Sequence, residues 1–146
     1  MKRLLVALDF SADTGGIVRI AIALGRALHA EVRLLHVAPP EPDFIGYDAG
    51  PPTVRQQAAA EYQEARRELH ALERQFASEG MMVDALVIQG DPRQKIPAEA
   101  KEFRADLIIL GARGRGAVHE WLVGGVTSAV IKKADCPVIV VPPRKE

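Results

Sequence analysis

The chain has 146 residues, of which 48% are hydrophobic and 26% are charged. This length predicts one domain, residues 1–146, that buries a core without disulfides or metal. The 19 Lys and Arg balance the 19 Asp and Glu. The zero net charge therefore argues against binding duplex nucleic acid or an anionic membrane through a basic excess. We expect no transmembrane span and no signal peptide, since Asp9 interrupts the first apolar run. A single cysteine, Cys136, fits a reducing compartment, so we expect a soluble cytoplasmic protein in which this thiol is packed rather than catalytic.

Short continuous apolar runs alternate with longer amphipathic stretches along the chain. The short runs predict strands at residues 4–8, 32–37, 83–89, 106–110 and 137–141. Between them, apolar residues recur at helical spacing. The helices are expected from about Ile17 to Leu28 with Ser11 or Asp13 as the cap, over 54–79 with Gly80 at the end, after Gly90-Asp91-Pro92, and from Gly124 onward. The intervening loop at 38–53 is long for a compact domain and suggests a mobile segment or a lid.

This alternation predicts an α/β fold of one domain. Strands that are apolar throughout, rather than at every second residue, are typical of a parallel sheet covered by helices on both faces. Right-handed crossovers then give an open doubly wound, Rossmann-like sheet. In such sheets ligands bind beyond the carboxyl ends of the strands, where the strand order reverses. The residues after each strand are therefore the candidates for function.

The most unusual of these segments follows the fourth strand. It contains glycines and arginines in Gly111-Ala112-Arg113-Gly114-Arg115-Gly116, and then Gly124-Gly125-Val126-Thr127 at the start of the last helix. Glycine allows close backbone approach, and a helix N-terminus presents unpaired N–H groups to an anion. Two interpretations remain open from composition: an anion site for a nucleotide phosphate, or a glycine-rich turn with two solvated arginines.

Standard catalytic and phosphate motifs do not fit the chain. Gly111 and Gly116 have P-loop spacing, but Ala117-Val118 stands where Lys and Ser or Thr are needed. The first strand is followed by Gly15-Gly16 without the dinucleotide-binding pattern. His119-Glu120 lacks the second histidine of a zinc protease, because Val123 occupies that position. We therefore expect no catalytic residue and no protein-held metal.

The arrangement nevertheless resembles the universal stress protein family. Gly111-x-x-Gly114, nine residues and then Gly124 are similar to the family's nucleotide signature, G-x2-G-x9-G-[S/T]. The resemblance covers the whole chain, with 6–11, 35–37, 90–92, 106–111 and 136–141 similar to the family's other recurring segments. It implies a parallel sheet of strand order 3-2-1-4-5 and a homodimer joined through the strand at 137–141. It also implies an adenine nucleotide ligand, ATP or else AMP or ADP, with magnesium.

The resemblance also implies positions for the ligand. Val37 would contact adenine, the end of the first strand would line the nucleotide, and the glycine segment would follow ribose and phosphates. The site residues implied are Ala7, Leu8, Asp9, Val37, Leu110, Gly111, Arg113, Gly114, Gly124, Gly125, Val126 and Thr127. Two of these have a second possible role: Asp9 could cap the first helix, and Thr127 could cap the last one instead of offering its hydroxyl to a phosphate.

The chain departs from the signature at Gly125, where nucleotide-binding members carry Ser or Thr. The missing hydroxyl removes a hydrogen bond worth about 1–3 kcal/mol if its acceptor is a charged oxygen. The sequence is therefore consistent with two functions. The first is an ATP-binding regulatory stress-response protein with at most slow hydrolysis, and the second is a dimeric interaction module of the same fold that binds no nucleotide. Restoring serine at 125 would be expected to tighten ATP more than AMP.

Overall fold

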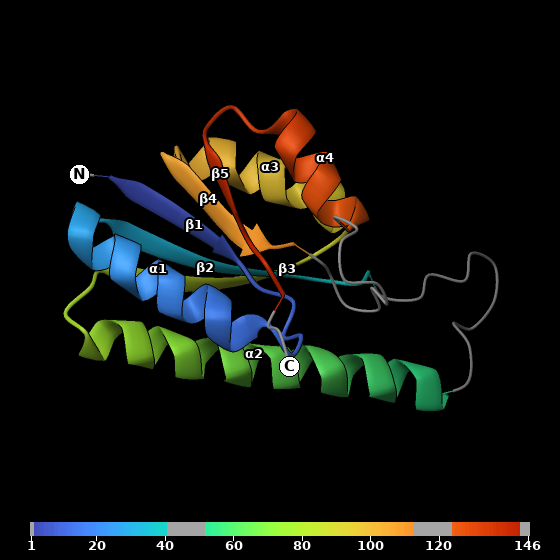
Figure 1. The fold of residues 1–146 in the computed structure, drawn as a ribbon. Coiled ribbons are helices and arrows are strands. Elements are labelled where there is room, and N and C mark those ends of the chain that lie inside the picture. The colour runs from blue at the N-terminus through green and yellow to red at the C-terminus, as the bar shows by residue number, and fades with distance from the viewer. Residues whose placement is uncertain (1, 41–51, 113–123, 144–146) are drawn as a thin grey trace.

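The computed structural model describes residues 2–40, 52–112 and 124–143 (Figure 1). Five parallel strands form one sheet in the order β3-β2-β1-β4-β5. The strands are β1 (Arg3–Ala7), β2 (Glu31–Ala38), β3 (Val83–Gln89), β4 (Leu107–Gly111) and β5 (Val138–Val141). The helices are α1 (Thr14–Leu28), α2 (Pro52–Ser78), α3 (Pro92–Phe103) and α4 (Gly125–Lys133). This confirms the predicted fold class and strand order, with boundaries that differ from the predicted ones by one or two residues at most ends.

The sheet separates two hydrophobic cores, one beneath each helical layer (Figure 1). Along β1, Leu4 and Val6 join the core under α1 and α2, while Leu5 and Ala7 join the core under α3 and α4. Successive side chains of a strand point to opposite faces, so a strand that is covered on both sides must be apolar at every position. The continuous apolar runs in the sequence therefore reflect a three-layer architecture.

Helix α2 lies on the sheet through one apolar stripe. Ala65, Leu69 and Phe76 are buried on this stripe, as the helical spacing of apolar residues predicts. The helix ends at Ser78, and Gly80 has a positive φ of 81°. A residue with a side chain pays a steric cost in this conformation, which explains glycine at the turn into β3.

The start of α1 differs in detail from the expectation. Asp13 occupies the N-cap position, but its side chain makes no capping hydrogen bond. The Ser11 hydroxyl instead accepts a 3.4 Å hydrogen bond from the Asp13 N–H. The sequence thus indicated the right place for the helix to begin but not the capping chemistry.

Among the described residues, no helix is both long and apolar enough to cross a membrane.

Candidate functional site

A cavity of about 490 Å³ lies beyond the carboxyl ends of β1, β2 and β4. Strand β1 lies between β2 and β4, so the chain winds away from it in both directions and leaves a crevice there. Every sequence-predicted site residue that the structure describes lines this cavity: Ala7, Leu8, Asp9, Val37, Leu110, Gly111, Gly124, Gly125, Val126 and Thr127. Arg113 and Gly114, the other two predicted residues, lie outside the described residues, as does most of the long loop at 38–53.

The inner wall of the cavity is apolar. Ala7, Leu35 and Ile96 line it and are buried in the core beneath α3 and α4. Val37, near the end of β2, is half-buried and adds a branched side chain at the rim. A wall of this kind favours binding of a flat, weakly polar ring such as a nucleobase, because the ring displaces water from the apolar surface.

Polar groups gather where β1 ends. The Asp9 carboxylate accepts a 3.0 Å hydrogen bond from the Ser11 N–H, so it closes the turn that precedes α1 rather than capping the helix itself. Phe10 follows with a positive φ of 59°, an uncommon conformation for a bulky residue. The Phe10 ring packs 4.8 Å from that of His36. The turn therefore holds Asp9 in the lining of the cavity.

His36 is buried beneath this turn and lines the same cavity. Its Nδ1 lies 2.8 Å from the carbonyl oxygen of Leu8. Because a carbonyl only accepts, the His36 Nδ1 carries a proton and donates it in this bond. This bond links β2 to the residue just beyond β1 and fixes the relative position of the two strand ends.

The opposite wall is the N-terminus of α4. Gly124 is its N-cap and offers no side chain to the helix, although the Gly124 N–H donates a 2.8 Å hydrogen bond to the Ala112 carbonyl. The N–H groups of the first turn, at Gly125, Val126 and Thr127, have no acceptor within a helix. Together with the helix dipole they favour an anion in the cavity.

Thr127 has a third role that the sequence did not reveal. Its hydroxyl donates a 2.7 Å hydrogen bond to the Gly111 carbonyl, and the residue is only 2% exposed. This bond uses the hydroxyl proton, so the Thr127 side chain holds α4 against the end of β4. Its backbone N–H remains directed toward the start of the helix.

Sequence reasoning missed one cation of the site. Arg93, in the first turn of α3, lines the cavity, and its Nη2 lies 3.3 Å from the point where a Cβ on Gly125 would stand. The signal was present, because Arg93 directly follows Gly90-Asp91-Pro92, which marks the carboxyl end of β3. Sequence spacing could not show that α3 crosses toward α4.

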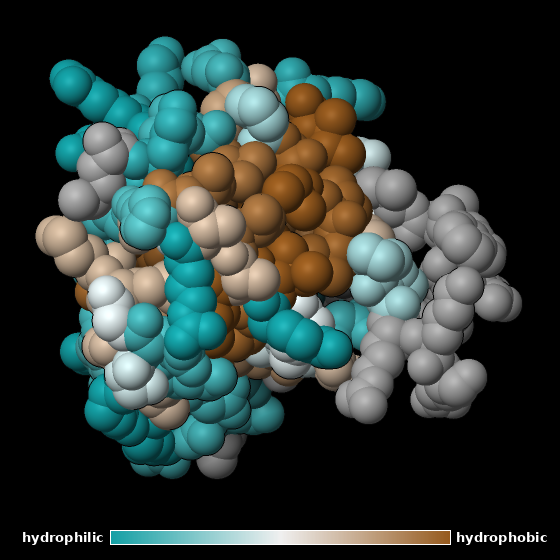
Figure 2. Space-filling view, turned by 60° about the vertical axis from the view of Figure 1, so that its left-hand side comes forward, coloured by the Kyte–Doolittle hydropathy of each residue, from teal (hydrophilic) through white to brown (hydrophobic). Residues whose placement is uncertain are grey.

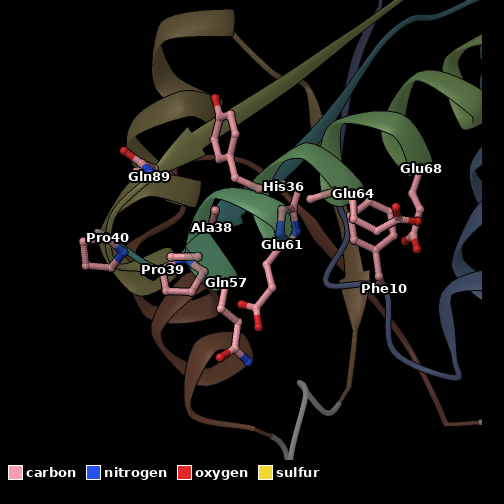
Figure 3. A pocket seen from close by; sticks show the side chains of 13 residues that line it. Phe10, His36, Ala38, Pro39, Pro40, Gln57, Glu61, Glu64, Glu68 and Gln89 are labelled. Atoms are coloured by element: carbon pink, nitrogen blue, oxygen red, sulfur yellow. The ribbon is translucent and has the colours of Figure 1, made fainter. Parts of the chain in front are cut away.

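A second cavity, of about 420 Å³, adjoins the first (Figure 3). His36 and Pro39 line both. The second cavity is bordered by three glutamates of α2, Glu61, Glu64 and Glu68, and its described lining includes no lysine or arginine. Carboxylates that line a cavity repel a phosphate placed in it. The charged groups that line the two cavities therefore differ, and of the two only the cavity with Arg93 and the α4 N-terminus suits an anion.

The comparisons with known proteins agree with this fold. The chain belongs to the universal stress protein family, whose family model matches residues 1–142, and is a stress-response protein of that family. It is 31% identical to the "Universal stress protein in QAH/OAS sulfhydrylase 3'region" of Thermus aquaticus, over 96% of this chain and 98% of the relative.

Two solved structures are similar over nearly the whole chain. The universal stress protein UspA from Lactobacillus plantarum is 26% identical, with a TM-score of 0.83 over 96% of this chain and 97% of that one. The universal stress protein from Archaeoglobus fulgidus in complex with dAMP shares the fold at 22% identity, with a TM-score of 0.66 over 97% and 98% of the two chains.

Proposed function

We propose that this protein binds an adenine nucleotide, ATP by preference, at the carboxyl ends of β1, β2 and β4, and that it acts as a nucleotide-dependent regulator in the stress response. The observation that carries the proposal is one cavity with an apolar inner wall and a helix N-terminus opposite it. The two walls match the two ends of a nucleotide, an apolar base and an anionic phosphate. The dAMP complex of the Archaeoglobus fulgidus protein supports this choice of ligand class.

The proposal gives each part of the site a task. Val37 and the apolar wall take the adenine, and the Asp9 carboxylate accepts a hydrogen bond from the base or a ribose hydroxyl. Leu110, Gly111, Arg113 and Gly114 follow the ribose and phosphates. The first turn of α4 binds the phosphates through its N–H groups.

Magnesium fits this site as a companion of the phosphates. Among the described residues, no group of three His, Cys, Asp or Glu side chains comes together to hold a metal ion. Mg²⁺ is often held by substrate phosphates and one or two carboxylates. Asp9 is the only carboxylate among the described lining residues, so it would be the protein's contribution. With this single carboxylate closing a turn, we assign the site a regulatory role and at most slow hydrolysis.

Native mass spectrometry of freshly purified protein, followed by calorimetry with ATP, AMP and GTP, tests the proposal. We expect co-purified adenine nucleotide or direct binding of ATP, and weaker binding of GTP. A protein that carries no nucleotide and binds none of the three would support the alternative function, a dimeric interaction module of the same fold.

We further propose that the chain forms a homodimer through β5. This strand is an edge of the sheet and carries no charged side chain. Figure 2 shows hydrophobic residues gathered over the area of β5 and the neighbouring part of α4. An uncharged edge next to an apolar area invites aggregation, and pairing it with its own copy around a two-fold axis covers it. The family resemblance implies the same arrangement.

A further inference from the structure

The Arg93 guanidinium lies beside the position that a Cβ on Gly125 would take. A Cβ at residue 125 would stand 3.3 Å from Arg93 Nη2, 3.7 Å from Nε and 3.8 Å from Cζ. All three distances involve the guanidinium itself, so the group lies over the first residue of α4. Glycine at 125 therefore suits arginine at 93, since a Cβ at 125 would require the guanidinium to shift by a few tenths of an ångström.

Arg93 is an exposed residue that lines the cavity. Its side chain forms no ion pair among the described residues. Arg93 also lies in the first turn of α3, whose N-terminus carries partial positive charge, and a basic residue is unfavourable there. Asp91 caps α3, but its carboxylate accepts a 3.0 Å bond from the Arg93 backbone N–H rather than from the guanidinium.

Positive charge therefore converges on one wall of the cavity. Helix α3 directs the guanidinium toward the N-terminus of α4, which has glycine as its N-cap and so no carboxylate or hydroxyl to complete its first turn. A guanidinium carries five donors in a planar fork that matches phosphate oxygens. An anion placed between Arg93 and this turn would receive donors from both helices.

We propose that Arg93 binds the outer phosphates of the nucleotide and sets the preference for ATP over AMP, replacing the hydroxyl that Gly125 lacks. This inference rests on the proposed nucleotide site. The backbone of Gly125 is not in the positive-φ region, so serine would fit the backbone there. Gly125 thus leaves room for the Arg93 side chain, and the charged guanidinium takes over the contact to phosphate that a serine hydroxyl would make.

The test is the ratio of ATP to AMP affinity measured by calorimetry for the wild type and Arg93→Met. Methionine keeps much of the aliphatic length and removes the fork. We expect ATP affinity to fall about tenfold, the size of one charge-assisted interaction, with AMP affinity unchanged within about twofold. Lys95→Met is the matched control, because Lys95 lies in the same helix, packs against Gly90 and does not line the cavity. It should leave the ratio unchanged.

A second variant tests the exchange between the two residues. Gly125→Ser in the Arg93→Met background should restore part of the ATP preference, whereas Gly125→Ser alone should gain little or lose affinity because it displaces the guanidinium. The sequence alone predicts a different result, in which Gly125→Ser tightens ATP more than AMP.

The outcomes separate the two proposals. Normal AMP binding with an ATP to AMP ratio unaffected by Arg93→Met would overturn the role of Arg93 and leave the nucleotide site intact. A ratio lowered equally by Lys95→Met would also overturn it, since the effect would then be general charge. Failure of the wild type to bind either nucleotide would contradict the site itself.

Discussion

The Thr127 hydroxyl donates a 2.7 Å hydrogen bond to the carbonyl of Gly111, across the junction between β4 and α4. Gly111 is the last residue of its strand, and Thr127 is in the first turn of its helix. The bond therefore fixes the position of the α4 N-terminus relative to the end of the sheet. The α4 wall of the proposed phosphate region therefore depends on this junction.

Replacing Thr127 by Val should destabilise the protein and weaken nucleotide binding together. Valine keeps the shape but leaves the partly buried Gly111 carbonyl without its donor, a loss of about 1–3 kcal/mol in the free energy of unfolding. Because the whole helix start shifts, ATP and AMP should lose affinity by similar factors. Urea unfolding and calorimetry measure the two effects. Thr127→Ser keeps the hydroxyl and should retain most of the stability and most of the nucleotide affinity. A valine variant with wild-type stability would show that the bond contributes nothing.

Gly114→Val tests the part of the signature that lies outside the described residues. A branched side chain at this position would stand where the signature brings the chain close to the phosphates, and valine strongly disfavours the backbone conformations that glycine permits. We expect ATP binding to be lost while the circular dichroism spectrum and melting temperature stay near those of the wild type. Equal ATP affinity in the two proteins would contradict the proposed phosphate loop.

The β5 edge can be tested through its backbone. The Pro137 and Val141 carbonyls accept hydrogen bonds from Ile108 and Ala112, at 3.0 and 2.8 Å. Backbone groups of successive strand residues point to alternate sides, so those of Val138 and Val140 point away from β4 to the free edge. Proline at an outward position removes a donor only from the outer side.

We therefore expect Val140→Pro to weaken the homodimer while the monomer stays folded. Val140→Ala, which shortens the same side chain and keeps the N–H, is the control and should remain largely dimeric. Light scattering at tens of micromolar protein gives the mass of each variant, and a thermal melt reports folding. A wild type that is monomeric under these conditions would refute the dimer, and an alanine variant as monomeric as the proline one would refute the backbone pairing.

The reactivity of Cys136 should depend on pH in a defined direction. Burial raises the pKa of its thiol, and the nearby carboxylates of Asp106 and Asp135 raise it further. The thiolate is the reactive form, so the folded protein should react slowly with a disulfide reagent at neutral pH. Its rate should rise only at a more alkaline pH than that of the same chain unfolded in guanidinium.

The same shift affects stability. A raised pKa in the folded state means that this group stabilises the fold below its ordinary pKa and that the contribution is lost as the pH rises through the raised value. Cys136→Ala should remove this part of the alkaline dependence. A thiol that reacts as fast in the folded as in the unfolded chain at neutral pH would contradict the assignment.

Particular residues show why some of the site could be read from the sequence. Asp9, Val37 and Gly111 each follow or end an apolar run, and the carboxyl ends of parallel strands meet at one edge, so their convergence followed from strand order. The glycines at 124 and 125 marked a helix start by composition alone. By contrast, the sequence suggested a helix cap or a phosphate for the Thr127 hydroxyl and gave no sign of its hydrogen bond to Gly111, which lies sixteen residues earlier in the chain.

The sequence by itself determined the fold class, the strand order through the family resemblance, and the edge of the sheet at which a ligand would bind. These follow from hydrophobic period and from motif spacing, which are properties of short stretches of chain. Only the tertiary structure decided that Arg93 of α3 lies over Gly125 of α4, and that the neighbouring cavity is lined by glutamates of α2. Both depend on how helices cross the sheet, and side chains of different helices meet only when packing fixes the crossing.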